Sequence, residues 1–107
     1  MAKNKSSISE CPITRTMDLI GGKWSLPIIY GLMKGTKRFK ELERSIEGIN
    51  TRMLVKELKQ LEESGIISGK VFAEVPPRVE YSLTPKGQAL KNVLLEMQTW
   101  GKKFVEV

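Results

Sequence analysis

Hydrophobic residues recur every three or four positions through the first two thirds of the chain, and this spacing predicts four helices. The helices cover residues 12–20, 24–33, 39–46 and 51–64. Gly21, Gly35 and Gly65 follow three of these segments, where a glycine commonly ends a helix. The last two helices are joined by a tight turn at residues 47–50, so we expect them to form a helix-turn-helix.

The hydrophobic spacing changes after Gly65 from the helical period of about 3.6 to the period of 2 that is typical of a strand. Apolar and polar residues alternate over residues 79–83, and residues 67–73 form a matching strand with a less regular pattern. Pro76 and Pro77 cannot donate ladder hydrogen bonds, so they belong to the connection. The segment therefore predicts a two-stranded β-hairpin with a stiff tip.

A long apolar stripe follows the hairpin and predicts a final helix. Thr84 is placed to cap this helix, Pro85 suits its first position, and the stripe continues to Phe104. The stripe is larger than a domain of this size needs for its own core, so we expect it to form a symmetric homodimer interface with the first helix. The alternative is that the helix packs back onto its own chain. The residues assigned to the dimer interface are Ile13, Met17, Leu90, Val93, Leu94, Met97, Trp100 and Phe104.

Together these elements describe a winged helix-turn-helix. The fold class is mainly α with a small β-hairpin, and the N- and C-terminal helices are expected to serve dimerisation. A length of 107 residues suits a single domain. We assign residues 11–107 to this domain and expect the polar, Ser-rich residues 1–10 to form a flexible tail.

Composition excludes most kinds of enzyme and metal site. The chain has no His and a single Cys, so it cannot supply a Ser-His-Asp triad, a His-ligated metal, a four-Cys zinc site or an internal disulfide. It also lacks the glycine-rich motifs that bind nucleotide phosphates. We therefore predict no enzyme activity, no metal and no other cofactor. An enzyme would need Cys11 as its nucleophile with Glu or Lys as its base, and no sequence pattern pairs them.

Positive charge is the main chemical signal in the sequence. Eighteen Lys and Arg residues against twelve Asp and Glu residues leave a net charge of +6. Residues 34–44 contain five basic and two acidic residues, so half of this surplus lies at the predicted helix-turn-helix. On a winged helix such a surplus indicates double-stranded DNA as the partner of the 11–107 domain. No apolar run approaches the ~20 residues of a membrane span, so we expect a cytoplasmic protein without a membrane partner.

The fourth helix carries the strongest candidates for DNA contact. If Leu54, Leu58 and Leu61 point inward, the basic residues of this helix lie on the opposite face, because successive residues are ~100° apart. The N-terminal end of such a helix commonly meets base edges, and Arg52 can bind guanine O6 and N7 there. The predicted DNA-binding residues are Lys37, Arg38, Lys40, Asn50, Thr51, Arg52, Lys56, Lys59 and Arg78.

Several of these basic residues are expected to bind phosphates, which positions a protein on DNA without reading its sequence. Lys37, Arg38 and Lys40 lie at the start of the third helix, and Arg78 follows the prolines of the hairpin. For each of them the alternative is an ordinary solvated surface charge.

Five separate blocks of sequence carry a further signal. The blocks are Cys11-Pro12, Leu19-Ile20-Gly21-Gly22-Lys23-Trp24, Arg38-Phe39-Lys40-Glu41-Leu42, Gly48-Ile49-Asn50-Thr51-Arg52-Met53-Leu54 with Glu57-Leu58 and Leu61-Glu62, and Pro76-Pro77-Arg78-Val79-Glu80-Tyr81-Ser82-Leu83-Thr84 with Gly87. In this order they resemble the HxlR-type bacterial transcriptional regulators. The resemblance covers about residues 11–101 and implies a dimeric winged-helix DNA-binding protein related in architecture to MarR-type repressors. Many members have Ser where this chain has Asn50.

Cys11 is a separate candidate for chemistry. A thiol at a helix N-terminus is favoured as thiolate by the helix dipole, and Arg15 one turn later adds positive charge. Some HxlR-type proteins sense oxidants or electrophiles through a similarly placed Cys, so the resemblance implies a redox role. The alternative is a small, partly buried residue without reactivity. With one Cys per chain, oxidation can cap the thiol or join two subunits.

The sequence leaves two functions open. The first is a sequence-specific transcriptional regulator, expected to be a repressor, that binds a pseudo-palindromic operator as a homodimer on the nucleoid of a bacterial cytoplasm. The second is a winged-helix module that binds another protein, with its basic charge incidental. Salt-dependent DNA binding would favour the first, and a stable protein complex without DNA binding would favour the second. The sequence identifies no small-molecule effector, operator or target gene.

Overall fold

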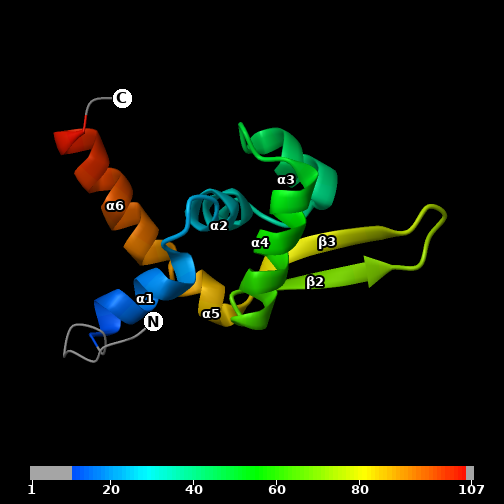
Figure 1. Ribbon diagram of the computed structural model, residues 1–107, viewed down its shortest axis with the longest axis horizontal. Coiled ribbons are helices and arrows are strands. Elements are labelled where there is room, and N and C mark those ends of the chain that lie inside the picture. The colour runs from blue at the N-terminus through cyan, green and yellow to red at the C-terminus, as the bar shows by residue number, and fades with distance from the viewer. Residues whose placement is uncertain (1–10, 106–107) are drawn as a thin grey trace.

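The computed structural model describes residues 11–105 of the protein (Figure 1). The helices are α1 (Pro12–Ile20), α2 (Ser25–Met33), α3 (Phe39–Ser45), α4 (Thr51–Glu63), α5 (Pro85–Gln88) and α6 (Lys91–Phe104), and the strands are β1 (Lys37–Arg38), β2 (Ile67–Phe72) and β3 (Arg78–Leu83). None of the helices within the described range is long and apolar enough to span a membrane. The tail predicted at residues 1–10 lies outside the described residues.

The arrangement of these elements confirms the predicted winged helix-turn-helix. The hairpin of β2 and β3 projects from one end of the molecule, close to α3 and α4 (Figure 1). The helices α1 and α6 lie toward the opposite end. The two ends of the molecule therefore present different surfaces, one built around the hairpin and one built from the terminal helices.

Capping residues set both ends of α4. Asn50 precedes the helix, and its side-chain Oδ1 accepts a hydrogen bond at 2.8 Å from the backbone N–H of the third helical residue. At the other end Gly65 takes a φ of +77°, which a glycine adopts without steric cost. The backbone N–H of Ile66 then donates to the Leu61 carbonyl at 3.0 Å and closes the helix. Both boundaries match the sequence prediction.

The turn between α3 and α4 holds the two helices in a fixed relation. Gly48 lies in this turn with a φ of +88°, as predicted for a residue that must take a positive φ. Ile46, the last apolar residue before the turn, is buried. Across the turn the Thr51 hydroxyl donates a hydrogen bond to the Glu43 carboxylate. The helix-turn-helix therefore includes a side-chain contact between its helices that the sequence did not indicate.

The sheet has three strands instead of the two that the sequence predicted. Its order is β1–β3–β2, and both pairings are antiparallel. Lys37 pairs with Tyr81 and Arg38 pairs with Glu80, so β1 joins the residues just before α3 to the hairpin. A two-residue strand shows no alternation in the sequence, and its partner strand lies far away along the chain. The pairing therefore became visible only in the folded molecule.

The prediction of one long helix after Thr84 is wrong, because that helix is divided into α5 and α6. Thr84 caps α5 as expected, with its hydroxyl accepting a hydrogen bond from the Gly87 N–H at 3.1 Å. The Leu90 N–H bonds to the Gly87 carbonyl three residues earlier, which tightens the end of α5. Gly87 also lies so close to Ile66 that a Cβ would stand 2.2 Å from the Ile66 carbonyl oxygen. This close docking sets the position of α5 before α6 begins.

The hydrophobic core forms where α2, α3 and α4 meet the base of the hairpin. Its largest fully buried side chains are Ile28, Ile29, Leu32, Leu42, Leu54, Leu58, Leu61 and Ile66. Ser25 is the buried polar residue of this region, and its hydroxyl lies 3.4 Å from the Glu57 carboxylate that accepts its hydrogen bond. Fully burying a side chain of leucine size contributes about 1.5–3 kcal/mol. The core therefore fixes α4 against α2 by one apolar face.

Replacing Leu54 with Ala should destabilise the domain by about 2–5 kcal/mol, because the side chain is fully buried and its loss leaves a cavity. Urea unfolding followed by circular dichroism would measure this change in the free energy of unfolding. Val55→Ala is the matched control, since the neighbouring side chain is half exposed and should cost less than about 1 kcal/mol. Equal destabilisation by the two substitutions would contradict the burial of this face of α4.

Candidate nucleic-acid interface

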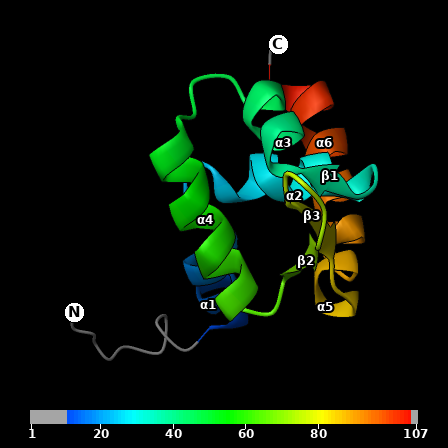
Figure 2. The same cartoon turned by 90° about the vertical axis from the view of Figure 1, so that its right-hand side faces the viewer.

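The outer face of α4 carries basic residues, because its three leucines are buried on the opposite side. The exposed basic residues on this face are Arg52, Lys56 and Lys59, as the sequence predicted. Figure 2 views the molecule from the hairpin end and shows α3, α4 and the hairpin together at that end. A helix with exposed cations beside a projecting hairpin is the arrangement in which a helix enters the major groove of DNA.

At the N-terminal end of α4, one cationic side chain has no ion-pair partner within residues 11–105. Asn50 uses its side chain to cap the helix, and Thr51 donates its hydroxyl to Glu43. Arg52 is exposed and forms no ion pair with any residue in the range 11–105. Among the three residues predicted to meet base edges, Arg52 therefore has the free side chain, and the other two hold the start of the helix.

A groove of about 800 Å³ lies between the start of α3 and the hairpin. Arg38, Lys40 and Arg44 line it on one side, and the prolines of the hairpin line it on the other. Lys37 is half-buried in β1 and is not among the lining residues. Arg44 was missing from the predicted contacts, although it belongs to the basic segment 34–44. Its position one helical turn after Lys40, on the same face of α3, is the signal that could have identified it.

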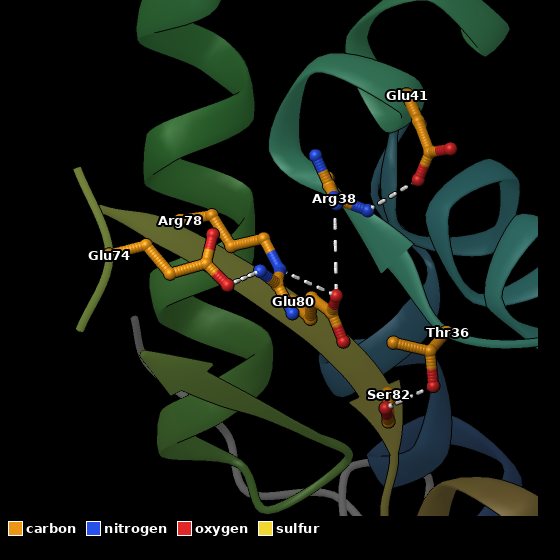
Figure 3. A network of polar contacts seen from close by, with 7 residues as sticks. All are labelled: Thr36, Arg38, Glu41, Glu74, Arg78, Glu80 and Ser82. Atoms are coloured by element: carbon orange, nitrogen blue, oxygen red, sulfur yellow. Dashed lines mark hydrogen bonds and ion pairs between the residues drawn. The ribbon is translucent and has the colours of Figure 1, made fainter. Parts of the chain in front are cut away.

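Arg78, which the sequence predicts as a DNA contact on the hairpin, has carboxylate partners in its own chain. Its guanidinium donates to Glu80 Oε2 at 2.9 Å and forms an ion pair with Glu74 on its other side (Figure 3). It also lies over Phe72, with its central carbon 4.0 Å from the ring centroid. Hydrogen bonding to Glu74 and then to Glu80 raises the pKa of Arg78. The charge of Arg78 is thus already matched by carboxylates of its own chain, which the sequence pattern did not reveal.

The helices α1 and α6 expose most of the apolar side chains predicted for a dimer interface. Ile13 is 74% exposed and Trp100 is 60% exposed. The other exposed members are Met17, Val93, Met97 and Phe104. Leu94 differs from the prediction, because it is only 6% exposed and belongs to the core of its own chain, and Leu90 packs against that core. The predicted stripe is therefore split between the chain's own packing and a free apolar face.

Cys11 stands at the N-cap of α1, as predicted, and is partly buried. Its thiol forms no side-chain capping hydrogen bond to the start of α1. The backbone N–H groups of Thr14 and, next, Ile13 nevertheless hold the pKa of Cys11 below its usual range. Arg15, the other predicted source of positive charge, is not among the causes of this shift. The free amides at the start of α1 are therefore what favours the thiolate.

Comparison with known proteins identifies the family. Residues 19–107 match the model of the HxlR-like helix-turn-helix family. The chain belongs to this family. A relative from Bacillus subtilis, the HTH-type transcriptional regulator YdeP, is 46% identical over 94 residues, which are 88% of this chain and 73% of YdeP. The resemblance seen in the sequence is thus confirmed.

Two solved structures, with sequences 42% and 43% identical to this chain, share its fold. A protein described as a MarR-family transcriptional regulator, from Porphyromonas gingivalis W83, is 42% identical with a TM-score of 0.87, covering 95% of this chain and all (100%) of that chain. The oxidised form of the redox regulator HypR is 43% identical with a TM-score of 0.84, covering 91% of this chain and 100% of HypR. This HxlR-like protein is therefore a DNA-binding transcriptional regulator with a winged helix-turn-helix.

Alkylation of Cys11 by iodoacetamide should show a pH midpoint below the pKa of about 8.5 that an unperturbed thiol has, because the amides at the start of α1 favour the thiolate. The alkylation rate of the folded chain, followed as pH rises, measures this midpoint. The same chain unfolded in urea is the control, and its midpoint should return to the ordinary value. Equal midpoints in the folded and unfolded chains would contradict the effect of α1.

Proposed function

We propose that this regulator represses transcription by binding a pseudo-palindromic operator as a homodimer, on the nucleoid in the bacterial cytoplasm. The observation that carries the proposal is the outer face of α4, where three exposed cations stand opposite three buried leucines. A helix held by its apolar face beside a projecting hairpin fits the major groove, whose width admits an α-helix.

Arg52 is the proposed base-reading residue. Its side chain is exposed and forms no ion pair within residues 11–105, and it lies in the first turn of α4. A guanidinium there can donate two parallel hydrogen bonds to guanine O6 and N7, which discriminates against other bases by about 1–3 kcal/mol. Asn50 and Thr51 support this contact by holding the start of the helix through the cap and the hydrogen bond to Glu43.

The other exposed cations at this end are the proposed phosphate ligands. The exposed ones come from the outer face of α4 and from the groove between α3 and the hairpin, and they are Arg38, Lys40, Arg44, Lys56 and Lys59. The half-buried Lys37 of β1 is proposed with them. Phosphate contacts release counterions from DNA, so the resulting affinity falls as salt concentration rises. These residues would fix the position of α4 on the duplex without reading its sequence.

The proposed dimer forms through the free apolar faces of α1 and α6. Val93 and Leu94 are successive residues and therefore ~100° apart, so α6 buries one side in its own chain and leaves the adjacent side open. Trp100 and Phe104 lie on the open side, with ring centroids 5.3 Å apart. Aromatic side chains of this kind are enriched at protein interfaces. A two-fold axis through this face presents two α4 helices to half-sites about one turn of DNA apart.

A redox response through Cys11 is the proposed signal. It is supported by the lowered pKa of the thiol and by the likeness to HypR, a protein named as a redox regulator. Because each chain has one Cys, oxidation can join the thiols of two chains as a disulfide, with two electrons and two protons passing to the oxidant. It can also form a mixed disulfide with a small thiol. An alkylation midpoint no lower than that of the unfolded chain would remove the basis for this role.

The Arg52→Ala variant should lose about 1–3 kcal/mol of operator binding and should also relax the base preference at one position of each half-site. Lys40→Ala is the contrasting variant, because loss of a phosphate contact should weaken all duplexes alike and reduce the slope of log affinity against log salt by about 0.9. Fluorescence anisotropy at several salt concentrations, on fragments selected from genomic DNA, measures both effects. Salt-insensitive binding, or a stable protein complex in place of DNA binding, would support the protein-interaction alternative.

The Trp100→Ala variant should weaken the dimer at least about thirtyfold, because an aromatic anchor at the centre of an interface contributes about 2 kcal/mol or more. Sedimentation equilibrium over a range of concentrations measures the dissociation constant. Lys102→Ala is the control, since Lys102 is exposed on the far side of α6 and should leave the dimer unchanged. A wild-type chain that stays monomeric at high concentration would exclude the proposed dimer.

A further inference from the structure

A series of charged side chains connects α3 to the hairpin, and Glu80 lies at its centre (Figure 3). Glu80 Oε2 accepts a hydrogen bond from Arg78 Nε at 2.9 Å and lies 4.0 Å from Arg38 Nε. Both arginines line the groove between α3 and the hairpin. The Glu80 carboxylate therefore pairs with two arginines beside the groove in which we place the DNA backbone.

On the outer side of Glu80, Arg78 holds the far part of the hairpin together. A second guanidinium nitrogen of Arg78 pairs with Glu74 in the connection between β2 and β3. The same guanidinium lies 4.0 Å from the ring centroid of Phe72, the last residue of β2. These contacts reach both strands and the connection, so the position of Arg78 and the shape of the hairpin end depend on each other.

On the inner side of Glu80, Arg38 connects β3 to α3. Arg38 and Glu80 are direct partners in the β1–β3 ladder, and the Arg38 backbone N–H donates to the Glu41 carboxylate at 2.8 Å. The hydroxyls of Thr36 and Ser82 share a hydrogen bond at 2.8 Å beside the same strand pair. These polar contacts join β3 to β1 and to the start of α3, in addition to the apolar packing at the base of the hairpin.

The ion pair between Arg38 and Glu80 is open to competition from a phosphate. The Arg38 side chain is 58% exposed, and an exposed pair at 4.0 Å is weak in water. A DNA phosphate offers an arginine two acceptor oxygens, which suits the fork geometry of the guanidinium. Arg78 is held more firmly, because it has a carboxylate on each of two sides. Displacing Glu80 from Arg38 therefore costs free energy on every duplex, whatever its base sequence.

We infer that Glu80 is a positioning residue that limits how much Arg38 and Arg78 contribute to the sequence-independent part of DNA binding. It links β3 to the start of α3 through Arg38, and it occupies both arginines, so that each must leave this carboxylate before it can bind a phosphate. This role of Glu80 rests on the proposed binding of operator DNA by α4. It places a control of the salt-dependent affinity on the hairpin, away from the base-reading helix.

The Glu80→Gln variant of the full chain tests this role, because it keeps the size of the side chain and removes its charge. Anisotropy titrations on a selected operator and on a random duplex of equal length, at several salt concentrations, measure affinity and salt slope. We expect binding to the random duplex to strengthen at low salt, with a slope steeper by about 0.9 for each arginine released. Binding to the operator should strengthen by a similar factor, so the preference for the operator over the random duplex should stay unchanged, because phosphate contacts carry no sequence information.

Asp18→Asn is the matched control, since it removes one negative charge from an exposed position on α1, far from the hairpin. Its affinities and its slope should stay at wild-type values. Glu74→Gln releases Arg78 on one side only, so it should strengthen binding and steepen the slope by a smaller amount than Glu80→Gln. Thermal unfolding of each variant checks its fold, and Glu74→Gln decides the question if Glu80→Gln does not fold.

Three outcomes would overturn the role of Glu80. Equal weakening of both duplexes with an unchanged slope would show that the residue only supports the fold. If Glu80→Gln keeps the wild-type affinities and salt slope, then Glu80 does not restrain either arginine from binding phosphate. This result would leave the proposed function intact. A wild-type protein that binds no duplex at all would overturn the proposed function together with the role of Glu80.

Discussion

Burial of one face of α4 is the interaction on which the rest of the structure depends. Leu54, Leu58 and Leu61 are removed from water in the core that α4 shares with α2 and α3, and each contributes roughly 1.5–3 kcal/mol. Because a helix is rigid and its residues are ~100° apart, the same burial directs Arg52 outward. The side chains that stabilise the fold therefore also decide which side chains can meet DNA.

The helix α4 and the hairpin are held by different forces. The helix α4 is fixed by apolar packing, by its caps and by the contact between Thr51 and Glu43. The hairpin meets α3 through a two-residue strand and through Glu80, whose partners are arginines. Apolar packing is insensitive to salt, whereas exposed ion pairs are screened by salt and compete with phosphates. The position of α4 therefore depends mainly on apolar packing, whereas the contact between the hairpin and α3 also depends on charge.

The terminal helices show how one sequence pattern can serve two purposes. The stripe along α6 has helical spacing throughout, but Leu94 lies in the chain's own core while Trp100 stays exposed. Helical periodicity identifies which residues share a face, and it carries no information about what covers that face. The division of the stripe follows from the docking of α5, which places Gly87 against the Ile66 backbone and sets where α6 begins.

Local physical chemistry made the helices and their boundaries predictable from the sequence. Helix ends depend on backbone groups only a few residues away, so the residues that set them can be identified from the sequence alone. Examples are Pro12 at the start of α1, Asn50 before α4 and Gly65 after it. Only the tertiary structure decided the pairing of β1 with β3, the break between α5 and α6, and the carboxylates that hold Arg78. Pairing and docking join segments that are distant along the chain, and the partners of Arg78 depend on side-chain geometry, so neither leaves a periodic signal.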